Sequence, residues 1–371
     1  MSTSKKKLCI VSLKAYPLFN KNCNGIFGGA EVQLYLLAQA LSKHEDLDIS
    51  FIVADYGGKK IEMFNEIKII KSFRFEDNAL SKNLKFLNSL LLSNSNIFVQ
   101  RTLDPASGIL SLICRIRGAK FIYMVAHDNE TNGLYEKNIG FLKRLLANAV
   151  FKFSDLVIVQ NVTQKELLLK NKNRTSFLIK SGYFLSKFTP SKKSELDYVL
   201  WVSRSKKWKQ PEIFIQLASC NPKFQFKMIC PKAFDDTDEW YNHLKQKAGN
   251  VFNLEFIEFV PFDEIDIYFR NASIFVNTSL NEGFPNTYIQ ATKNGTPILS
   301  LNVNPDNFLD EYSCGYFCNN EFDKLNEKLN LLIGDVTLHN KMSKNAYEYA
   351  VENHNIMKSA EQLYNLFTGL K

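Results

Sequence analysis

The feature that most constrains the fold is an alternation of short apolar runs with helical periodicities, which occurs twice along the chain. In the first half, short apolar runs predict buried strands at 8–13, 49–54, 67–71, 97–100, 120–125 and 156–160. Apolar residues at helical spacing separate most of them, at 32–43, 80–92, 106–117, 139–153 and 163–170. Strands that alternate with helices indicate a doubly wound α/β domain built on a parallel sheet.

The second half repeats this pattern. Strands are predicted at 198–202, 224–230, 254–259, 274–277 and 297–301. Helices are predicted at 211–219, 237–249, 262–269, 286–293, 321–333 and 338–354, followed by a tail at 358–370. A stretch rich in Gly, Pro, Ser and Lys at 181–195 favours a linker between the two series. A chain of 371 residues also suits two domains better than one.

The positive charge is concentrated in the first half. The formal net charge is +8, with 26 Lys and Arg against 15 Asp and Glu in residues 1–182, and 20 against 23 in the remainder. A basic half favours phosphate-rich ligands or an anionic membrane surface as partners. The periodic segment 139–153 carries Lys and Arg among Phe and Leu, as basic amphipathic surface helices do. Solvated lysines and an ordinary helix with one face in the core explain the same composition.

The cysteines and the N-terminus point to the cytoplasm. Seven cysteines are scattered, none in a CxxC pair and none with a zinc-ligand spacing, so no metal site is expected. The first apolar run is too short for a signal peptide, and no run approaches the roughly 20 apolar residues that span a bilayer. We therefore expect a cytoplasmic protein, with peripheral attachment to the inner face of the membrane compatible with its charge.

Two segments of the first half are expected at the carboxyl ends of strands, where ligands of such sheets gather. Gly28 and Gly29 close a loop between the first strand and the first helix, which allows a ligand to approach the backbone. The loop is not GxGxxG, so it lacks the dinucleotide fingerprint. His127 and Asp128 directly follow the strand at 120–125, and we expect them to contact substrate. A flexible connection and a structural histidine are the alternatives.

Two segments of the second half carry complementary chemistry. Residues 203–211, SRSKKWKQP, place four cations in a turn that precedes a helix beginning with proline, which suits a diphosphate. Residues 282–300, EGFPNTYIQATKNGTPILS, form a turn that opens into a helix, whose free N–H groups also suit a phosphate. Glu282 and Gln290 could then bind hydroxyl groups beside it, which indicates a sugar nucleotide. An ordinary strand–helix crossover fits the second pattern equally well.

The combined spacing resembles the family 4 retaining glycosyltransferases, which are known as glycosyl transferases group 1 and have the GT-B fold. The matching residues are Arg204 and Lys209, the Glu282-Gly283-Phe284 triplet and the position eight after Glu282. The Gly-Gly-Ala-Glu at 28–31, the His127-Asp128 pair and the Asn-Gly-Thr-Pro at 294–297 match as well. The resemblance covers nearly the whole chain.

The resemblance implies two Rossmann-like doubly wound domains that face each other across a cleft. Residues 1–185 would bind the acceptor, residues 186–352 would bind the nucleotide sugar, and residues 353–371 would form a helix that crosses back to the first domain. The implied reaction moves a sugar from a nucleotide diphosphate-sugar, UDP- or GDP-linked, to a hydroxyl of a glycan or lipid-linked glycan. It retains the anomeric configuration, needs no metal or other cofactor, and belongs to cell-surface polysaccharide or glycolipid biosynthesis.

The resemblance also implies residue roles. Arg204 and Lys209 would stabilise the diphosphate as it leaves, and Glu282 would hold the hydroxyls of the donor sugar. His127 would donate a hydrogen bond near the reacting sugar, and Asp128 would lie near the acceptor. The remaining donor contacts would come from Gly28, Gly29, Gly283, Phe284, Pro285, Asn286, Thr287 and Gln290.

Three positions depart from the family pattern. Gln290 stands where relatives usually have a glutamate that binds the ribose, although an amide oxygen can still accept a hydrogen bond. Ser203 and Gln210 replace two glycines beside the Arg/Lys pair. Because of Gln290, a non-catalytic nucleotide-sugar-binding protein is one alternative function, and an epimerase, which can share the same two-domain fold, is another. Nucleic acid is not expected as a partner, because no binding motif accompanies the charge.

Overall fold

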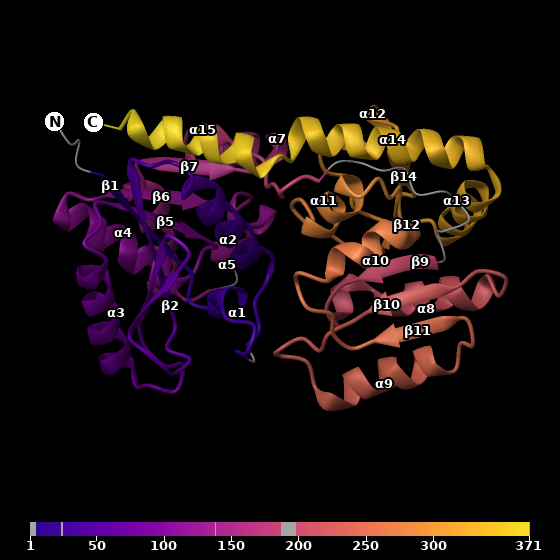
Figure 1. The fold of residues 1–371 in the computed structure, drawn as a ribbon, viewed down its shortest axis with the longest axis horizontal. Helices are drawn as coiled ribbons and strands as arrows, with labels where there is room; N and C mark the ends of the chain where they lie inside the picture. Colours follow the sequence, from indigo (N-terminus) through magenta and orange to yellow (C-terminus); the bar gives the residue numbers. More distant parts are fainter. Residues whose placement is uncertain (1–4, 24, 138, 187–197, 371) are drawn as a thin grey trace. The chain divides into compact units, whose positions relative to one another are not determined.

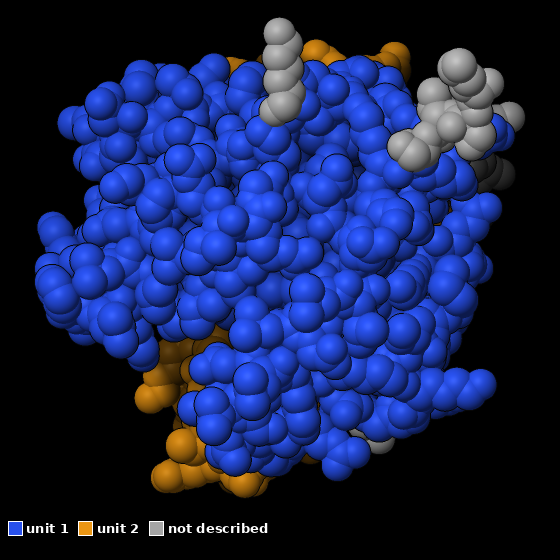
Figure 2. All heavy atoms as spheres, turned by 90° about the vertical axis from the view of Figure 1, so that its left-hand side faces the viewer, with its two compact units in different colours: residues 1–184, 356–371 blue, residues 185–355 orange. Residues whose placement is uncertain are grey.

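The computed structural model describes residues 5–23, 25–137, 139–186 and 198–370, and the chain forms two compact units (Figure 1). Unit 1 comprises residues 1–184 together with 356–371, and unit 2 comprises residues 185–355; the two are coloured separately in Figure 2. Most of the predicted linker, residues 187–195, lies outside the described residues.

Unit 1 is built on an eight-stranded sheet with the order β3-β4-β2-β1-β5-β6-β7-β8. The strands are β1 (Lys6–Val11), β2 (Leu47–Val53), β3 (Ile61–Phe64), β4 (Ile67–Lys71), β5 (Ile97–Arg101), β6 (Lys120–Met124), β7 (Leu156–Val159) and β8 (Phe177–Leu178). All neighbours are parallel except β3 and β4. β5 and β7 are buried along their whole length, and β1 is buried from Leu8 onward, because helices cover both faces of the sheet.

Four helices share one face of this sheet. They are α3 (Ala79–Ser93), α4 (Pro105–Arg117), α6 (Phe141–Phe153) and α7 (Val162–Lys172). Their apolar residues form one core with alternate strand residues, as Phe86 of α3, Leu110 of α4 and Phe151 of α6 illustrate. Helix α2 (Gly29–Leu41) follows β1, where the chain proceeds across the sheet in the opposite direction, and so belongs to the other face. Short helices α1 (Tyr16–Phe19), η1 (Asp128–Glu130) and α5 (Leu134–Lys137) lie in the connections.

The antiparallel edge strand β3 was not predicted from the sequence. It pairs with β4 through a tight turn in which Asn65 has a φ of 51°. Its residues alternate between exposed and half-buried, as on a sheet edge with one solvated face. β3 therefore lacks the continuous apolar run on which the strand predictions were based.

Unit 2 has a six-stranded, fully parallel sheet with the order β11-β10-β9-β12-β13-β14. The strands are β9 (Tyr198–Val202), β10 (Phe226–Ile229), β11 (Leu254–Ile257), β12 (Ala272–Asn277), β13 (Ile298–Ser300) and β14 (Gly315–Phe317). Its larger helices are α8 (Pro211–Cys220), α9 (Asp238–Gly249), α10 (Ile265–Asn271), α11 (Asn286–Lys293), α13 (Phe322–Gly334) and α14 (Val336–Asn353), with α12 (Phe308–Glu311), η3 (Lys207–Lys209) and η4 (Pro305–Asn307) as short turns. Helix α10 begins later than predicted because residues 261–264 form a turn on the Pro261 carbonyl.

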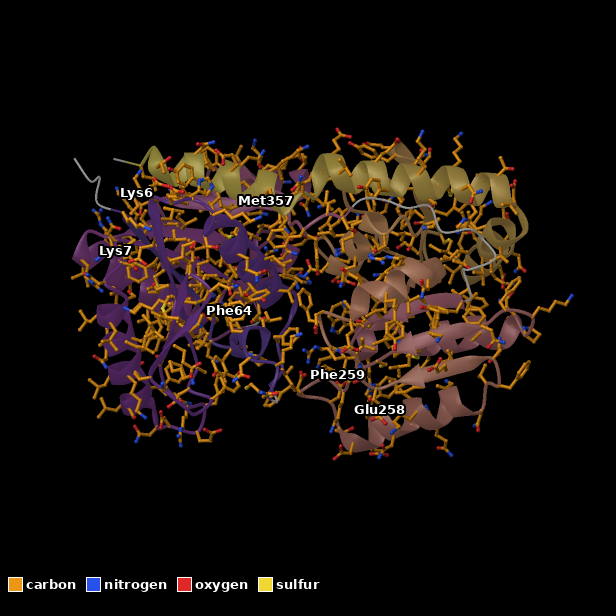
Figure 3. The ribbon with its side chains drawn as sticks, viewed as in Figure 1. Lys6, Lys7, Phe64, Glu258, Phe259 and Met357 are labelled. Carbon is orange, nitrogen blue, oxygen red and sulfur yellow. The ribbon has the colours of Figure 1, made fainter. Side chains whose placement is uncertain are left out.

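The last helix, α15 (Ile356–Thr368), belongs to unit 1 although the helices before it belong to unit 2. It packs along α2. Figure 3 labels Met357 near its start and Lys6 near its end, where Lys6 Nζ donates a hydrogen bond to the Thr368 carbonyl at 3.4 Å. The Ile356 N–H donates to the Tyr183 carbonyl at 3.1 Å, and Ser359 Oγ donates to the Lys180 carbonyl at 2.9 Å. The C-terminal segment thus completes a domain that begins with the first strand.

Candidate active site

The strand order of unit 2 identifies where its ligand site lies. Strands β9 and β12 are neighbours in the middle of the sheet. From β9 the chain continues to β10 and β11 at one edge, and from β12 it continues to β13 and β14 at the other. Loops that follow the two strands at such a switch point diverge and leave a crevice at their carboxyl ends. The loop after β9 carries Arg204 and Lys209, and the loop after β12 carries Glu282. Residues that are more than seventy positions apart therefore meet at one edge of the sheet.

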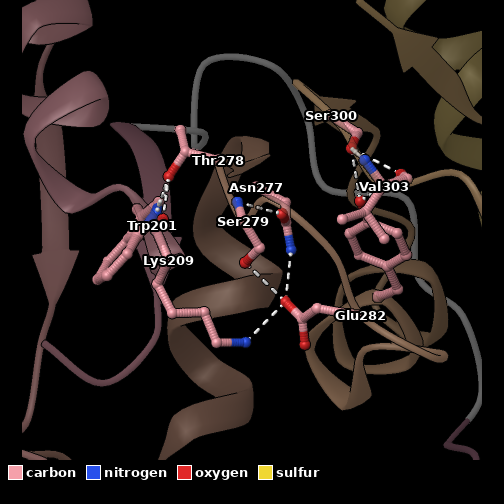
Figure 4. Close-up of polar contacts among 9 residues, drawn as sticks. Trp201, Lys209, Asn277, Thr278, Ser279, Glu282, Ser300 and Val303 are labelled. Carbon is pink, nitrogen blue, oxygen red and sulfur yellow. Dashed lines mark hydrogen bonds and ion pairs between the residues drawn. The ribbon is translucent and has the colours of Figure 1, made fainter. Parts of the chain in front are cut away.

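Lys209 and Glu282 are in direct contact (Figure 4). The Lys209 ammonium lies 2.7 Å from Glu282 Oε1. The same oxygen accepts hydrogen bonds from Ser279 Oγ at 2.7 Å and from Asn277 Nδ2 at 3.3 Å. Both charged side chains are largely buried, so their geometry is fixed by partners rather than by solvent. The cation and the carboxylate that the sequence predicted at one site are brought together by the fold.

A second set of hydrogen bonds fixes the backbone under this pair. Thr278 Oγ1 donates to the Lys209 carbonyl at 2.7 Å and accepts from Trp201 Nε1 at 3.0 Å (Figure 4). The Leu280 N–H donates to the Trp208 carbonyl at 2.9 Å. Sequence reasoning did not select Asn277, Thr278 and Ser279. The sequence feature that could have identified them is a run of three polar residues directly after an apolar strand.

The other cations of the same turn have different partners. Lys206 forms ion pairs with Asp235 and Asp236, and Lys207 Nζ lies 5.2 Å from the centre of the Trp240 ring. Arg204 is half-buried, and its carbonyl accepts the Lys206 N–H at 2.8 Å. The four-cation turn is therefore divided: Lys206 and Lys207 contact the segment 235–240, whereas Lys209 faces Glu282.

The shape of the turn explains one departure from the family pattern. Gln210 has φ 50° and ψ 51°, in the left-handed region that glycine adopts without strain. It precedes Pro211 at the start of α8, and its Oε1 accepts a hydrogen bond from Asn302 Nδ2 at 3.3 Å. Ser203 has no positive φ. Glutamine at 210 thus retains the conformation expected of glycine.

The segment after Glu282 separates into a packing residue and a helix start. The Phe284 ring is buried among aromatic residues, 5.3 Å from the Phe308 ring and 4.6 Å from the His354 ring. Phe284 therefore positions the loop with its side chain and offers a ligand only its backbone. Helix α11 begins at Asn286, so Asn286 and Thr287 lie in its first turn, after Gly283 and Pro285. Gln290 is one turn further on and is 6% exposed.

In unit 1, Gly28 and Gly29 form the start of α2, directly beyond the first strand's connection. Gly28 has a φ of −121°, so its conformation does not require glycine. Its N–H donates to Glu31 Oε2 at 2.7 Å, and an added Cβ would lie 3.0 Å from that oxygen. The two glycines therefore leave the first positions of α2 without a side chain, although Glu31 already accepts the Gly28 N–H.

His127 and Asp128 follow β6 as predicted, and the structure defines the hydrogen bonds of both. His127 Nδ1 accepts a hydrogen bond from the Asn129 N–H at 3.2 Å. The neutral ring then carries its proton on Nε2, which can donate to a ligand. Asp128 Oδ1 accepts from Gln164 Nε2 of α7 at 2.8 Å. In the sheet, β6, which precedes His127, is separated by β5 from β1, which precedes Gly28 and Gly29. The two predicted segments of unit 1 therefore follow strands that lie two positions apart.

Glu130, which sequence reasoning passed over, lies buried beneath the His127 turn. Its carboxylate accepts hydrogen bonds from Tyr123 Oη at 2.7 Å and from the Ala126 N–H at 3.0 Å. Burial raises the pKa of Glu130 to about 7, although these hydrogen bonds and the nearby Arg101 guanidinium lower it. Burial also lowers the pKa of Arg101 to about 10. Glu130 thus ties the loop that carries His127 to the core of unit 1.

Among the described residues, no group of three or more His, Cys, Asp or Glu side chains is arranged to hold a metal ion. Within the same ranges, no helix combines the length and the apolar character needed to cross a bilayer.

The second unit matches a family model. Residues 185–349 match the model described as glycosyl transferases group 1. Two relatives that match over most of the chain agree with it. The chain is 23% identical over 349 residues to an "Uncharacterized glycosyltransferase" of Haemophilus influenzae, covering 86% of this chain and 90% of the relative. It is 24% identical over 314 residues to the UDP-Gal:alpha-D-GlcNAc-diphosphoundecaprenol alpha-1,3-galactosyltransferase of Escherichia coli, covering 79% and 81%.

A solved structure agrees in fold. Anabaena Alr3699/HepE in complex with UDP and glucose superposes with a TM-score of 0.78 at 17% identity, covering 98% of this chain and 100% of that one. The GT-B fold class predicted from the sequence, with two parallel-sheet α/β domains, is thereby confirmed.

Proposed function

We propose that this chain transfers a sugar from a nucleotide diphosphate-sugar to a hydroxyl of a glycan acceptor, because residues 185–349 match the model of the glycosyl transferases group 1. The proposed transfer retains the anomeric configuration and uses protein cations in place of a metal ion. The product would enter cell-surface polysaccharide or glycolipid biosynthesis.

The observation that carries the proposal is the Lys209–Glu282 contact at the switch point of the second sheet. A diphosphate leaving group gains negative charge as the glycosidic bond breaks, and a cation positioned beforehand stabilises that charge. A carboxylate beside it accepts hydrogen bonds from sugar hydroxyls. In this proposal the donor sugar binds at Glu282, and Lys209, with Arg204 from the same turn, turns toward the diphosphate.

The relatives support a UDP-linked donor. The Escherichia coli relative is named for UDP-Gal, and the Anabaena structure contains UDP. The first turn of α11 would bind a phosphate through its free N–H groups. Gln290 would accept a hydrogen bond from the ribose where relatives use a carboxylate.

We assign acceptor binding to unit 1. His127 presents Nε2–H as a donor, and the adjacent Asp128 is held by Gln164 of α7. The Escherichia coli relative acts on a diphosphoundecaprenol-linked sugar, which supports a lipid-linked glycan as acceptor. Such an acceptor would place the reaction at the inner face of the membrane.

The first test is a thermal-shift screen with UDP-, GDP- and ADP-sugars, because a ligand that binds only the native state raises the melting temperature. Turnover is then measured as release of the nucleoside diphosphate with and without EDTA. We expect Arg204→Ala/Lys209→Ala to lower the rate by at least about a hundredfold. Lys207→Ala is the matched control, because it removes a cation of the same turn that contacts Trp240 instead. A full rate in the double variant would refute the proposed roles.

The same assay separates the alternatives. Isomerised sugar formed from donor alone would identify an epimerase. Tight binding of a donor without turnover, in the presence of lipid-linked and free glycans, would identify a binding protein.

A further inference from the structure

Helix α3 presents an apolar stripe to solvent. Leu80, Leu84, Leu87 and Leu91 are spaced four, three and four residues apart, which places them on one side of the helix. All four are exposed, Leu80 by 71% and Leu91 by 64%. The side that faces the core contains Phe86, Leu90 and two serines. The solvent side of α3 therefore carries an apolar stripe, beside Asn83 and Asn88, which an ordinary surface helix does not present.

Two further helices of the same layer share this property. Phe141, Leu142 and Leu145 of α6 are exposed, Phe141 by 75%. Ile116 at the end of α4 is 85% exposed, between Arg115 and Arg117. Because α3, α4 and α6 contribute to one core on one face of the first sheet, their outer sides face away from the same side of it. Figure 2 shows the side of unit 1 on which α3 and α4 lie.

Three of the four helices in this layer carry charge of one sign, whereas the fourth, α7, contains the exposed Glu166 beside its lysines. Helices α3, α4 and α6 contain seven Lys and Arg residues and not one Asp or Glu. The helices α2 and α15, which pack together, contain Glu31 and Glu361 against Lys358. Helices that combine exposed Leu and Phe with cations and contain no Asp or Glu are complementary to anionic lipid headgroups above an acyl layer.

We propose that the α3–α4–α6 layer of unit 1 is a docking surface for an anionic bilayer. The leucines of α3 and the apolar residues of α6 enter the headgroup region, and the cations bind the lipid phosphates. A second copy of the chain fits less well, because paired layers would bring together the cations of α4 and α6 of each copy, and these helices carry no acidic group. On α3, Lys85 is already paired with Asp77 at 2.8 Å. This surface lies outside the proposed active site, and the inference does not depend on the transfer reaction.

The test uses the full chain and sedimentation with vesicles of phosphatidylglycerol or of phosphatidylcholine. We expect binding to phosphatidylglycerol that weakens with added salt, and much weaker binding to phosphatidylcholine. Leu84→Gln/Leu87→Gln in α3 and Phe141→Gln/Leu142→Gln in α6 should each weaken binding by about tenfold or more. Arg115→Gln/Arg117→Gln should weaken binding to phosphatidylglycerol vesicles at low salt, by about fivefold for each cation removed.

Leu331→Gln/Phe252→Gln is the matched control, since it removes two exposed apolar side chains from unit 2. It should bind vesicles as the unaltered chain does. Equal binding to both lipids, no binding, or an equal loss in the control would overturn the proposal. So would a dimer in light scattering that the α3 variant abolishes. Release of the nucleoside diphosphate without vesicles should be unchanged in the α3 and α6 variants, which separates a failure here from a failure of the proposed function.

Discussion

The hydrogen bond on His127 Nδ1 determines what this side chain can do. Because Nδ1 accepts from the Asn129 N–H, the neutral ring offers a donor at Nε2 and no acceptor there. We expect His127→Ala to lower the transfer rate by about a hundredfold, the effect of one positioned donor. His243→Ala, on the exposed side of α9, is the control and should retain the rate. A ring protonated on Nδ1 in nitrogen NMR spectra would contradict the assigned tautomer.

Glu130 should make the stability of unit 1 depend on pH. Its folded-state pKa of about 7 lies above the value of an exposed carboxyl. Between about pH 4.5 and 7 the unfolded chain has released this proton and the folded chain still holds it, so stability falls as pH rises through that window. The full difference corresponds to about 3 kcal/mol. Urea unfolding at several pH values should show this slope, and Glu130→Gln should remove it. An unchanged slope in the variant would assign the pH dependence to other groups.

At the scale of elements, the turn before α8 contains measurable strain. Gln210 has a positive φ, a conformation that costs a residue other than glycine about 1 kcal/mol or more. Gln210→Gly should therefore leave stability unchanged or raise it by up to about 1 kcal/mol, since glycine also loses more backbone entropy. Gln210→Val should destabilise unit 2, because a β-branched residue tolerates this region least. Chemical denaturation that showed valine equal to glutamine would mean that the turn relaxes.

The contact between α4 and α6 depends on one glycine. A Cβ on Gly108 would lie 2.6 Å from the Leu146 carbonyl oxygen, which is backbone and cannot rotate away. Gly108→Ala should separate the two helices and cost about 1–3 kcal/mol, as overpacking does. Gly249→Ala is the control, because nothing lies near its added Cβ at the end of α9. A thermal melt of Gly108→Ala equal to that of the control would show that this contact is not as close as described.

Element boundaries and site residues were predictable to different degrees. Most of the parallel strands were found because both of their faces are buried, which makes them continuous apolar runs, whereas the two-residue parallel strand β8 was missed. The edge strand β3 and the three-residue strand β14 lack such a run. Lys209 and Glu282 were selected as one site from their chemistry and spacing. Glu130 was not, because an acidic residue in a polar loop is ordinarily solvated, and its burial depends on Arg101 and Tyr123, which come from two other strands.

For the whole molecule, the return of α15 makes the stability of unit 1 depend on residues at the far end of the chain. Leu363 of α15 is fully buried and packs within unit 1, whereas Leu329 of α13 is fully buried in the core of unit 2. Leu363→Ala and Leu329→Ala should each cost about 2–5 kcal/mol in the unit concerned. Glu361→Gln, an exposed change on α15, should cost less than about 0.5 kcal/mol.

The positions of the tryptophans allow the two units to be followed separately. All three tryptophans, Trp201, Trp208 and Trp240, belong to unit 2. Tryptophan fluorescence therefore reports the unfolding of unit 2, while far-ultraviolet circular dichroism reports both units. Leu363→Ala should lower the midpoint of a transition seen by circular dichroism and leave the fluorescence midpoint unchanged. Leu329→Ala should lower the fluorescence midpoint. If Leu363→Ala shifted fluorescence as far as Leu329→Ala does, the two units would unfold as one cooperative system, and α15 would stabilise the whole chain rather than its first unit.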